Sequence, residues 1–241
     1  MGGQQVKVMY YAPLPEGRSH AAFSARWRQH GELAMGLPLW RHMARYVQFD
    51  ALVAGQHGLA DEQLGMLRNA DYGGVGSIWF HSAEALAEAV ADPDNRRMEA
   101  DELETFGRRL GSDLVAATEH VVIDRGPAAI TVLNALHRTA GVSRASFSEQ
   151  WRAMGDALAA TPELARHVRS YVQDHALPDA EGWDGMVELG FDAPADFFAF
   201  VAEPKTSEWM MPHEAAFIDI PRGRPLITAG AVLYAGPALV A

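Results

Sequence analysis

The chain has 241 residues, of which 49% are hydrophobic and 21% charged, so it can bury one large core or two modest ones. Its formal net charge of −11, with no block of Lys or Arg to reverse it locally, opposes binding to nucleic acid or to anionic membranes. Cysteine is absent, and neither a signal-peptide pattern nor an apolar stretch of about 18 residues occurs, so we expect a cytoplasmic protein without disulfides or thiolate sites.

The N-terminal part of the chain predicts a strand followed by a helix. Residues 6–14 (VKVMYYAPL) are short and rich in β-branched and aromatic residues, which favours a strand. Ser19 can cap the next helix, because its side-chain oxygen accepts a hydrogen bond from an otherwise unpaired backbone N–H. Within that helix one buried stripe is predicted, formed by Phe23, Trp27, His30 and Ala34.

Three further strands and a second helix are predicted downstream. Residues 44–53 (ARYVQFDALV) alternate as a strand does, which places Tyr46, Gln48 and Asp50 on one face. The remaining elements are a strand at 73–80, a helix at 82–93 and a strand at 118–124. The resulting order βαββαβ is that of a ferredoxin-like unit.

The same unit occurs a second time in the chain. Three pairs of segments align: 17–34 with 141–159, Tyr-Val-Gln at 46–48 with 171–173, and 72–93 with 183–204. Each copy also opens and closes with an alternating apolar segment. We therefore predict a first repeat at residues 1–125 and a second repeat at residues 126–241.

A duplicated unit of this kind solves a packing problem within one chain. A four-stranded sheet with helices on one side leaves a wide apolar face that is unstable in water. The predicted fold is α+β, with two ferredoxin-like βαββαβ repeats packed sheet-to-sheet as an intrachain α+β barrel and the helices outside.

The motifs of both repeats resemble those of the EthD family, which belongs to the dimeric α+β barrel superfamily. The helix pattern F-x-x-x-W-x-x-H-G is found at Phe23, Trp27, His30 and Gly31, and the strand pattern Y-x-Q-x-H at Tyr171, Gln173 and His175. A glycine turn precedes the third strand of each repeat. The resemblance covers nearly the whole chain and implies the barrel fold, with a homodimer possible.

The resemblance implies several chemistries rather than one. The superfamily includes cofactor-free monooxygenases, isomerases, lyases, dehydratases of polycyclic compounds and some haem enzymes, and EthD proteins often accompany pathways that degrade aromatic compounds. The resemblance leaves haem bound through a lone histidine possible, as in some superfamily relatives, but the EthD pattern itself does not imply it. We expect no cofactor.

The two repeats depart from the family pattern at different histidines. The first repeat keeps His30 but has Asp50 where the strand histidine belongs, whereas the second keeps His175 but has Met154 at the helix position. Within one chain the two pockets are free to diverge into a working site and a supporting site, and either repeat can hold the working one.

The candidate catalytic residues follow from these motifs: His30 or His175 as the general base, Tyr46 or Tyr171 as the oxyanion donor, and Asp50 as the group that orients His30. The candidate substrate-binding residues are Trp27, Gln48, Gln173, Trp79, His120 and Trp209. Among them His120 is expected to face the barrel interior, and Trp79 and Trp209 to form an apolar lid. For the candidate histidines and tryptophans the alternative is a purely structural role, because a histidine or tryptophan on an apolar helical stripe is more often part of the core.

Other chemistries have little support in the sequence. It contains no H-E-x-x-H, no tight His/Asp cluster with metal-ligand spacing, no G-x-S-x-G and no G-x-G-x-x-G, so we expect no dedicated metal site. The first hypothesis is a cofactor-independent lyase, dehydratase or isomerase acting on a hydrophobic aromatic or polycyclic carbonyl compound in catabolism or tailoring. The alternatives are a cofactor-free monooxygenase and a non-catalytic binding or accessory protein for an apolar metabolite.

Overall fold

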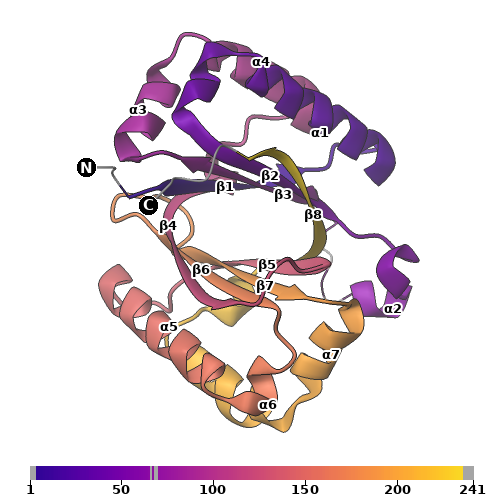
Figure 1. The fold of residues 1–241 in the computed structure, drawn as a ribbon, viewed down its shortest axis with the longest axis vertical. Coiled ribbons are helices and arrows are strands. Elements are labelled where there is room, and N and C mark those ends of the chain that lie inside the picture. The colour runs from indigo at the N-terminus through magenta and orange to yellow at the C-terminus, as the bar shows by residue number, and fades with distance from the viewer. Residues whose placement is uncertain (1–3, 66, 68–69, 236–241) are drawn as a thin grey trace. The chain divides into compact units, whose positions relative to one another are not determined.

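The computed structural model describes residues 4–65, 67 and 70–235, and its order of elements confirms the predicted duplication (Figure 1). The main elements of the first half are β1 (Val6–Pro13), α1 (His20–Met35), β2 (Met43–Ala51), β3 (Tyr72–Phe80), α3 (Ala83–Ala91), α4 (Asn95–Phe106) and β4 (Leu114–Asp124). Those of the second half are β5 (Ile130–Leu136), α5 (Arg144–Ala159), β6 (Ser170–Ala176), β7 (Gly185–Phe191), α7 (Pro194–Ala202), α8 (Met211–Glu214) and β8 (Leu226–Ala235). Two short helices, α2 (Asp61–Leu64) and α6 (Pro162–Ala165), and a 3-10 turn at Pro38–His42 complete the connections.

The strands pair in the order β1-β3-β2-β8-β5-β7-β6-β4, which is the order of a closed barrel. β1 pairs antiparallel with β3 and β4, and β3 pairs antiparallel with β2. In the second half β7 pairs antiparallel with β5 and β6, and β5 with β8. The orders β4-β1-β3-β2 and β8-β5-β7-β6 are those of two ferredoxin-like units, so the predicted α+β barrel is confirmed.

The chain consists of two compact units. The first unit comprises the described residues within 1–51, 70–118 and 230–241, and the second unit those within 52–69 and 119–229. The strands β4 and β8 each contribute to both units. The predicted division after residue 125 therefore stays a prediction about the sequence repeats, which these units do not follow at every point.

The long helix of each unit begins where the sequence predicts. The Ser19 hydroxyl accepts a hydrogen bond from the backbone N–H of Ala22 at 3.3 Å, and the Ser143 hydroxyl accepts one from Ser146 at 3.1 Å. In the first unit α1 and α4 lie side by side over one face of the sheet (Figure 1). The helix α4 is an addition to the predicted pattern, which placed one helix between the third and fourth strands.

A tryptophan of the long helix packs against a glycine of the sheet in both units. Trp27 and Trp151 are almost fully buried. A Cβ atom at Gly74 would lie 2.6 Å from the Trp27 ring, and one at Gly185 would lie 2.5 Å from the Trp151 ring. Glycine at these positions therefore allows each helix to approach its sheet closely. These motif glycines are paired residues of β3 and β7 rather than of a turn before the strand.

A glutamine side chain joins the same helix to the sheet, and we call this contact the glutamine bridge. In the first unit Gln48 Nε2 donates to the Trp27 carbonyl at 2.9 Å and to the Tyr46 hydroxyl at 2.8 Å. In the second unit Gln173 Nε2 donates to the Trp151 carbonyl at 2.6 Å and to the Tyr171 hydroxyl at 2.8 Å. The repeated Y-x-Q motif thus satisfies buried polar groups at the interface of helix and sheet.

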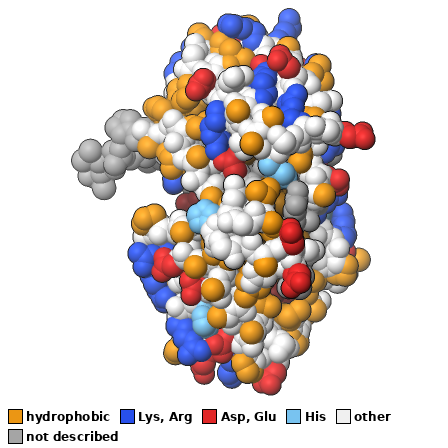
Figure 2. All heavy atoms as spheres, turned by 90° about the vertical axis from the view of Figure 1, so that its right-hand side faces the viewer, with side chains coloured by type: hydrophobic (Ala, Val, Ile, Leu, Met, Phe, Trp, Pro, Cys, Tyr) orange, Lys and Arg blue, Asp and Glu red, His pale blue; other side chains and the backbone are white. Residues whose placement is uncertain are grey.

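The surface carries both signs of charge. On the face shown in Figure 2, basic and acidic side chains are interspersed among apolar and neutral ones. Within the described part of the chain, no helix combines the length and the apolar character needed to cross a bilayer.

We predict that Gly185→Ala destabilises the protein by about 1–3 kcal/mol, because the added methyl group would lie 2.7 Å from the Asp174 carbonyl oxygen as well as against the Trp151 ring. Gly36→Ala is the matched control, since its Cβ would make only contacts of 3.4 Å and 3.6 Å. Urea unfolding monitored by circular dichroism measures both variants. Equal stability of Gly185→Ala and the wild type would show that the helix does not depend on this approach.

Candidate active site

An apolar cavity of about 180 Å³ lies in the first unit, where β1 and β3 meet α1, α3 and α4. Most of its lining is aliphatic or aromatic, and the lining side chains with polar atoms are Tyr10, His30, Trp40, Tyr46, Asn95 and Glu102. Val90 and Leu114 also line the cavity and are 62% and 39% exposed, so it reaches the surface beside α3 and β4. A few convergent polar groups in an apolar cavity are typical of a small-molecule site.

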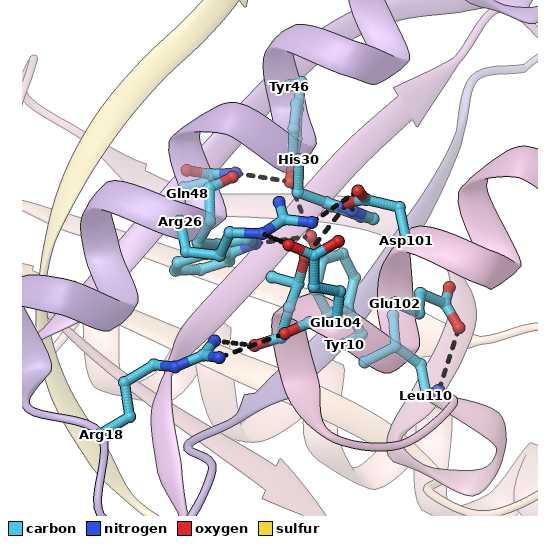
Figure 3. A network of polar contacts seen from close by, with 12 residues as sticks. Tyr10, Arg18, Arg26, His30, Tyr46, Gln48, Asp101, Glu102, Glu104 and Leu110 are labelled. Carbon is cyan, nitrogen blue, oxygen red and sulfur yellow. Dashed lines mark hydrogen bonds and ion pairs between the residues drawn. The ribbon is translucent and has the colours of Figure 1, made fainter.

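His30 projects from α1 into this cavity and is held by Asp101 of α4 (Figure 3). The His30 Nδ1 atom lies 2.6 Å from Asp101 Oδ2. Arg26 donates to the other oxygen of Asp101 at 2.5 Å, and Thr105 donates to Oδ2 at 3.1 Å. A carboxylate at Nδ1 favours the tautomer protonated on that nitrogen, which leaves Nε2 as a base. Among the described residues, Nε2 has no hydrogen-bond partner.

Burial and Asp101 act on the pKa of His30 in opposite directions. Burial lowers the pKa of His30 below its usual value of 6.5, although the hydrogen bond and charge of Asp101 oppose the shift. Burial raises the pKa of Asp101, but hydrogen bonds from Arg26 and His30 outweigh it and hold this pKa below its usual value. Near neutral pH the site therefore contains a neutral imidazole and an ionised carboxylate, as general-base catalysis requires.

Two tyrosines stand beside His30 in the same cavity. Their hydroxyl oxygens, Tyr10 Oη and Tyr46 Oη, lie 2.6 Å apart. Tyr10 also accepts a hydrogen bond from Trp27 Nε1 at 3.1 Å, and Tyr46 accepts one from Gln48 Nε2 at 2.8 Å. Burial raises the pKa of both phenols, which keeps them protonated.

This pair of phenols has one proton left over. Each hydroxyl already accepts one N–H, and the two share a single O–H···O bond, whichever of them donates it. Two hydroxyl protons are present and one is used, so among the described residues the other has no acceptor. Because both tyrosines line the cavity, that proton can be donated to a ligand oxygen.

Trp40 adds a second unused donor to the lining. Its indole Nε1 is buried and has no hydrogen-bond partner among the described residues. Its ring packs against Tyr46, with centroids 6.0 Å apart, and against Tyr234 at 5.0 Å. A buried N–H without a partner is costly, and a ligand oxygen would satisfy it.

The corresponding region of the second unit is filled. The repeat alignment places Met154 at the position of His30, Leu158 at that of Ala34 and Phe200 at that of Ala89. All three larger side chains belong to one hydrophobic core cluster of the second unit. The strand registers Val8↔Ile78 and Val132↔Leu189 match Tyr10 with Asn134, so the second phenol is also lost.

The structure brings only two of the predicted site residues, His30 and Tyr46, into the lining of this cavity. The expectation that Asp50 orients His30 is wrong, because Asp50 is an ion-pair partner of Arg28 and accepts a hydrogen bond from Ser24 at 2.7 Å. The orienting carboxylate is instead that of Asp101 on α4, a residue outside the helix and strand motifs of the two repeats.

The predicted residues of the second repeat form a buried hydrogen-bonded group. His175 Nδ1 lies 2.6 Å from the Ser148 hydroxyl and Nε2 lies 3.3 Å from Gln173 Oε1, so both ring nitrogens have partners. Burial is the main cause that lowers the pKa of His175 to about 3, and the charges of Arg152 and His120 add to this shift. Tyr171 is bonded to Gln173 within the core.

The remaining predicted substrate-binding residues lie outside the cavity lining. Trp27 and Gln48 are fully buried behind Tyr10 and Tyr46. The Trp79 ring is buried, and Lys7 Nζ and Arg45 Cζ lie 4.5 Å and 4.7 Å from its centroid. A ring in contact with two cationic side chains does not suit an apolar lid.

Two predicted residues belong to the second unit. The His120 ring lies 6.2 Å from that of His175, which faces α5 through Ser148, so the expectation that His120 faces the barrel interior is wrong. Trp209 packs on the core of the second unit and contacts His213, with ring centroids 5.6 Å apart.

Sequence reasoning missed Tyr10, Trp40, Asp101 and Glu102. A signal existed for α4, because Asn95, Met98 and Glu102 recur at the spacing of one helical face, and all three line the cavity. In the part of the chain that the structure describes, no three His, Asp or Glu side chains gather as metal ligands would.

Comparison with protein families gives a match in each repeat. The family model described as "EthD domain" matches residues 15–107 and 139–221. A comparison with curated protein sequences finds no match.

Solved structures with a similar fold include an anthrone oxidase-like protein, at 12% identity and a TM-score of 0.63, covering 98% of this chain and 96% of that chain. A proposed monooxygenase from Fusobacterium nucleatum aligns at 7% identity and a TM-score of 0.56, covering 97% and 94%. A proposed chlorite dismutase aligns at 12% identity and a TM-score of 0.51, covering 96% of each chain. At these identities the likeness concerns the fold alone.

We predict that NMR of the His30 ring nitrogens finds the Nδ1–H tautomer and a titration midpoint below 6.5. Asp101→Asn should lower the midpoint further, because it removes the charge that raises this pKa. Asp50→Asn is the matched control and should leave the His30 signals unchanged, since Asp50 contacts Arg28 and Ser24. A proton on Nε2 in the wild type would contradict the assignment.

We predict that His175 makes the fold acid-sensitive. Burial lowers the pKa of His175 to about 3 in the folded protein from its usual value of 6.5, so the unfolded chain binds a proton first and stability falls as the pH drops from about 6.5 toward 3. The loss is about 1.4 kcal/mol per pH unit for one such group. His175→Asn should flatten this slope by that amount in denaturant unfolding, whereas the exposed His213→Asn should not. Parallel slopes for His175→Asn and the wild type would exclude the effect.

Proposed function

The chain belongs to the EthD family, and from that premise we propose that it is an enzyme that removes a proton from a small apolar carbonyl compound, with His30 as the base. The observation that carries the proposal is the imidazole of His30, held by Asp101 inside an apolar cavity that also offers an unused phenol proton. A base and an oxyanion donor in one water-poor site are the minimum needed to form an enolate.

In the proposed step a proton moves from a carbon of the substrate to the Nε2 nitrogen of His30. With the substrate carbonyl oxygen against the tyrosine pair, the adjacent C–H faces His30 Nε2. The proton moves to Nε2, the C–H electron pair forms the enolate double bond, and negative charge builds on the oxygen. The free hydroxyl proton of Tyr10 or Tyr46 then hydrogen-bonds that charge, while Asp101 stabilises the imidazolium.

The size of the cavity limits the substrate. An apolar cavity of about 150 Å³ holds benzene, so about 180 Å³ suits one ring or two fused rings. The aliphatic and aromatic lining favours an uncharged ligand with few polar atoms. Larger polycyclic compounds would require movement of the cavity wall.

Proton removal leads to a lyase, dehydratase or isomerase reaction when the enolate expels a group or is protonated elsewhere. A second candidate is oxidation of the same enolate by dioxygen, which the names of the fold neighbours, an anthrone oxidase-like protein and a proposed monooxygenase, favour. There a CH₂ group becomes a carbonyl, one oxygen atom enters the product and the other leaves as water, so no external reductant is needed. Oxygen consumption with turnover distinguishes this outcome.

We predict that the protein catalyses exchange of the acidic C–H of β-tetralone in deuterated buffer, followed by proton NMR. His30→Gln should slow the exchange about 100-fold or more while the melting temperature stays within a few degrees. Glu32→Gln, an exposed change on the same helix, should exchange like the wild type. The rate should fall as the pH drops through the His30 pKa, which lies below 6.5.

Two results would count against this proposal. Undiminished exchange by His30→Gln would exclude His30 as the base. Saturable binding of β-tetralone without exchange, with or without air, would favour the binding-protein reading instead.

A further inference from the structure

The cavity contains a carboxyl group that proton removal by His30 does not use. Glu102 lines the cavity together with His30, Tyr10 and Tyr46. It follows Asp101 on α4, yet Asp101 is turned to His30 and Arg26, whereas Glu102 reaches toward Leu110 (Figure 3). The backbone N–H of Leu110 donates to Glu102 Oε2 at 3.3 Å. Among the described residues, the other carboxyl oxygen of Glu102 has no hydrogen-bond or ion-pair partner, so it is available to a ligand.

We propose that Glu102 is the general acid of a dehydration, and that the substrate class is a small cyclic ketone with a hydroxyl group on the carbon β to its carbonyl. This inference rests on the proposed function and deepens it, because it adds a second proton-transfer group on the cavity wall. A proton is then removed from the α-carbon, and another is delivered to the hydroxyl oxygen on the neighbouring β-carbon of the same substrate.

The atoms and electrons of this step balance. His30 Nε2 takes the proton from the α-carbon, and the C–H electron pair forms the enolate as above. The enolate oxygen then re-forms the carbonyl, and the enolate C=C electron pair shifts to form the double bond between the α- and β-carbons. The β-carbon–oxygen bond breaks, and the departing hydroxyl takes the proton of the Glu102 carboxyl and leaves as water. Afterwards His30 is protonated and Glu102 ionised, and exchange of one proton through water restores both.

The surroundings of Glu102 suit an acid. Burial raises the pKa of Glu102, and the negative charge of Glu99 adds to the shift, while the Leu110 N–H and the charge of Arg109 oppose it. Burial moves the pKa of His30 the other way, even with Asp101 beside it. Tyr10, also near Glu102, stays protonated and adds no charge. Two titratable groups pushed in opposite directions in one cavity are the usual arrangement of an acid and a base.

The competing explanation is that Glu102 only caps the Leu110 N–H. Glu102→Gln separates the two roles, because the amide oxygen still accepts that hydrogen bond but the side chain has no proton to give to a leaving group. A purely structural Glu102 would therefore be replaced without loss of rate.

The test uses two probes of equal ring size on the full chain. The first is α-tetralone carrying a hydroxyl on the carbon β to its carbonyl, which loses water and aromatises to the fluorescent α-naphthol. The second is β-tetralone, which has no leaving group and reports only proton removal. We expect Glu102→Gln to slow naphthol formation at least about 100-fold, a much larger loss than any that it causes in β-tetralone exchange. Glu32→Gln should match the wild type with both probes.

Each other outcome is decisive. Naphthol formation by Glu102→Gln at the wild-type rate overturns the acid role. Loss of both reactions in a folded Glu102→Gln also overturns it, because Glu102 would then serve proton removal itself. Absence of exchange in the wild type overturns the proposed function as well, whereas wild-type exchange without naphthol formation overturns the dehydration alone.

Discussion

The glutamine bridge is the contact on which each unit depends. The Gln48 and Gln173 amides satisfy a buried carbonyl of the long helix and a buried tyrosine hydroxyl at once. Leaving either group without a partner would cost about 1–3 kcal/mol. In the first unit the bridge does more, because it occupies an acceptor position of Tyr46 and so determines how the two phenols share their protons. A structural contact therefore also defines the donor in the cavity.

The difference between the units comes from side-chain volume as well as from chemistry. Small residues, Ala34 and Ala89, leave the cavity of the first unit open, and Leu158 and Phe200 close the same region of the second. The loss of a histidine at Met154 accompanies that closure. The second unit thus keeps the helix-to-sheet interface, while buried Leu158 and Phe200 stand where the first unit has Ala34 and Ala89.

Much of the fold could be predicted from the sequence because the chain contains the pattern twice. Alternation in β2 and β6, the serine caps and the motif glycines each had a second instance that confirmed the first. The site was less predictable, since the partner of His30 lies on α4, a helix outside the repeated pattern, so Asp101 had no counterpart in the second repeat. Asp50 stands on the same strand face as Tyr46, but only packing shows that Arg28 reaches it first.

The position of Asp101 ties the environment of His30 to the wall of the cavity. The helix α4 supplies both the carboxylate that holds His30 and the side chains Asn95, Met98 and Glu102 of the cavity wall. The same helix therefore sets both the tautomer of His30 and part of the shape of the cavity, so a substitution that shifts α4 would change the two together.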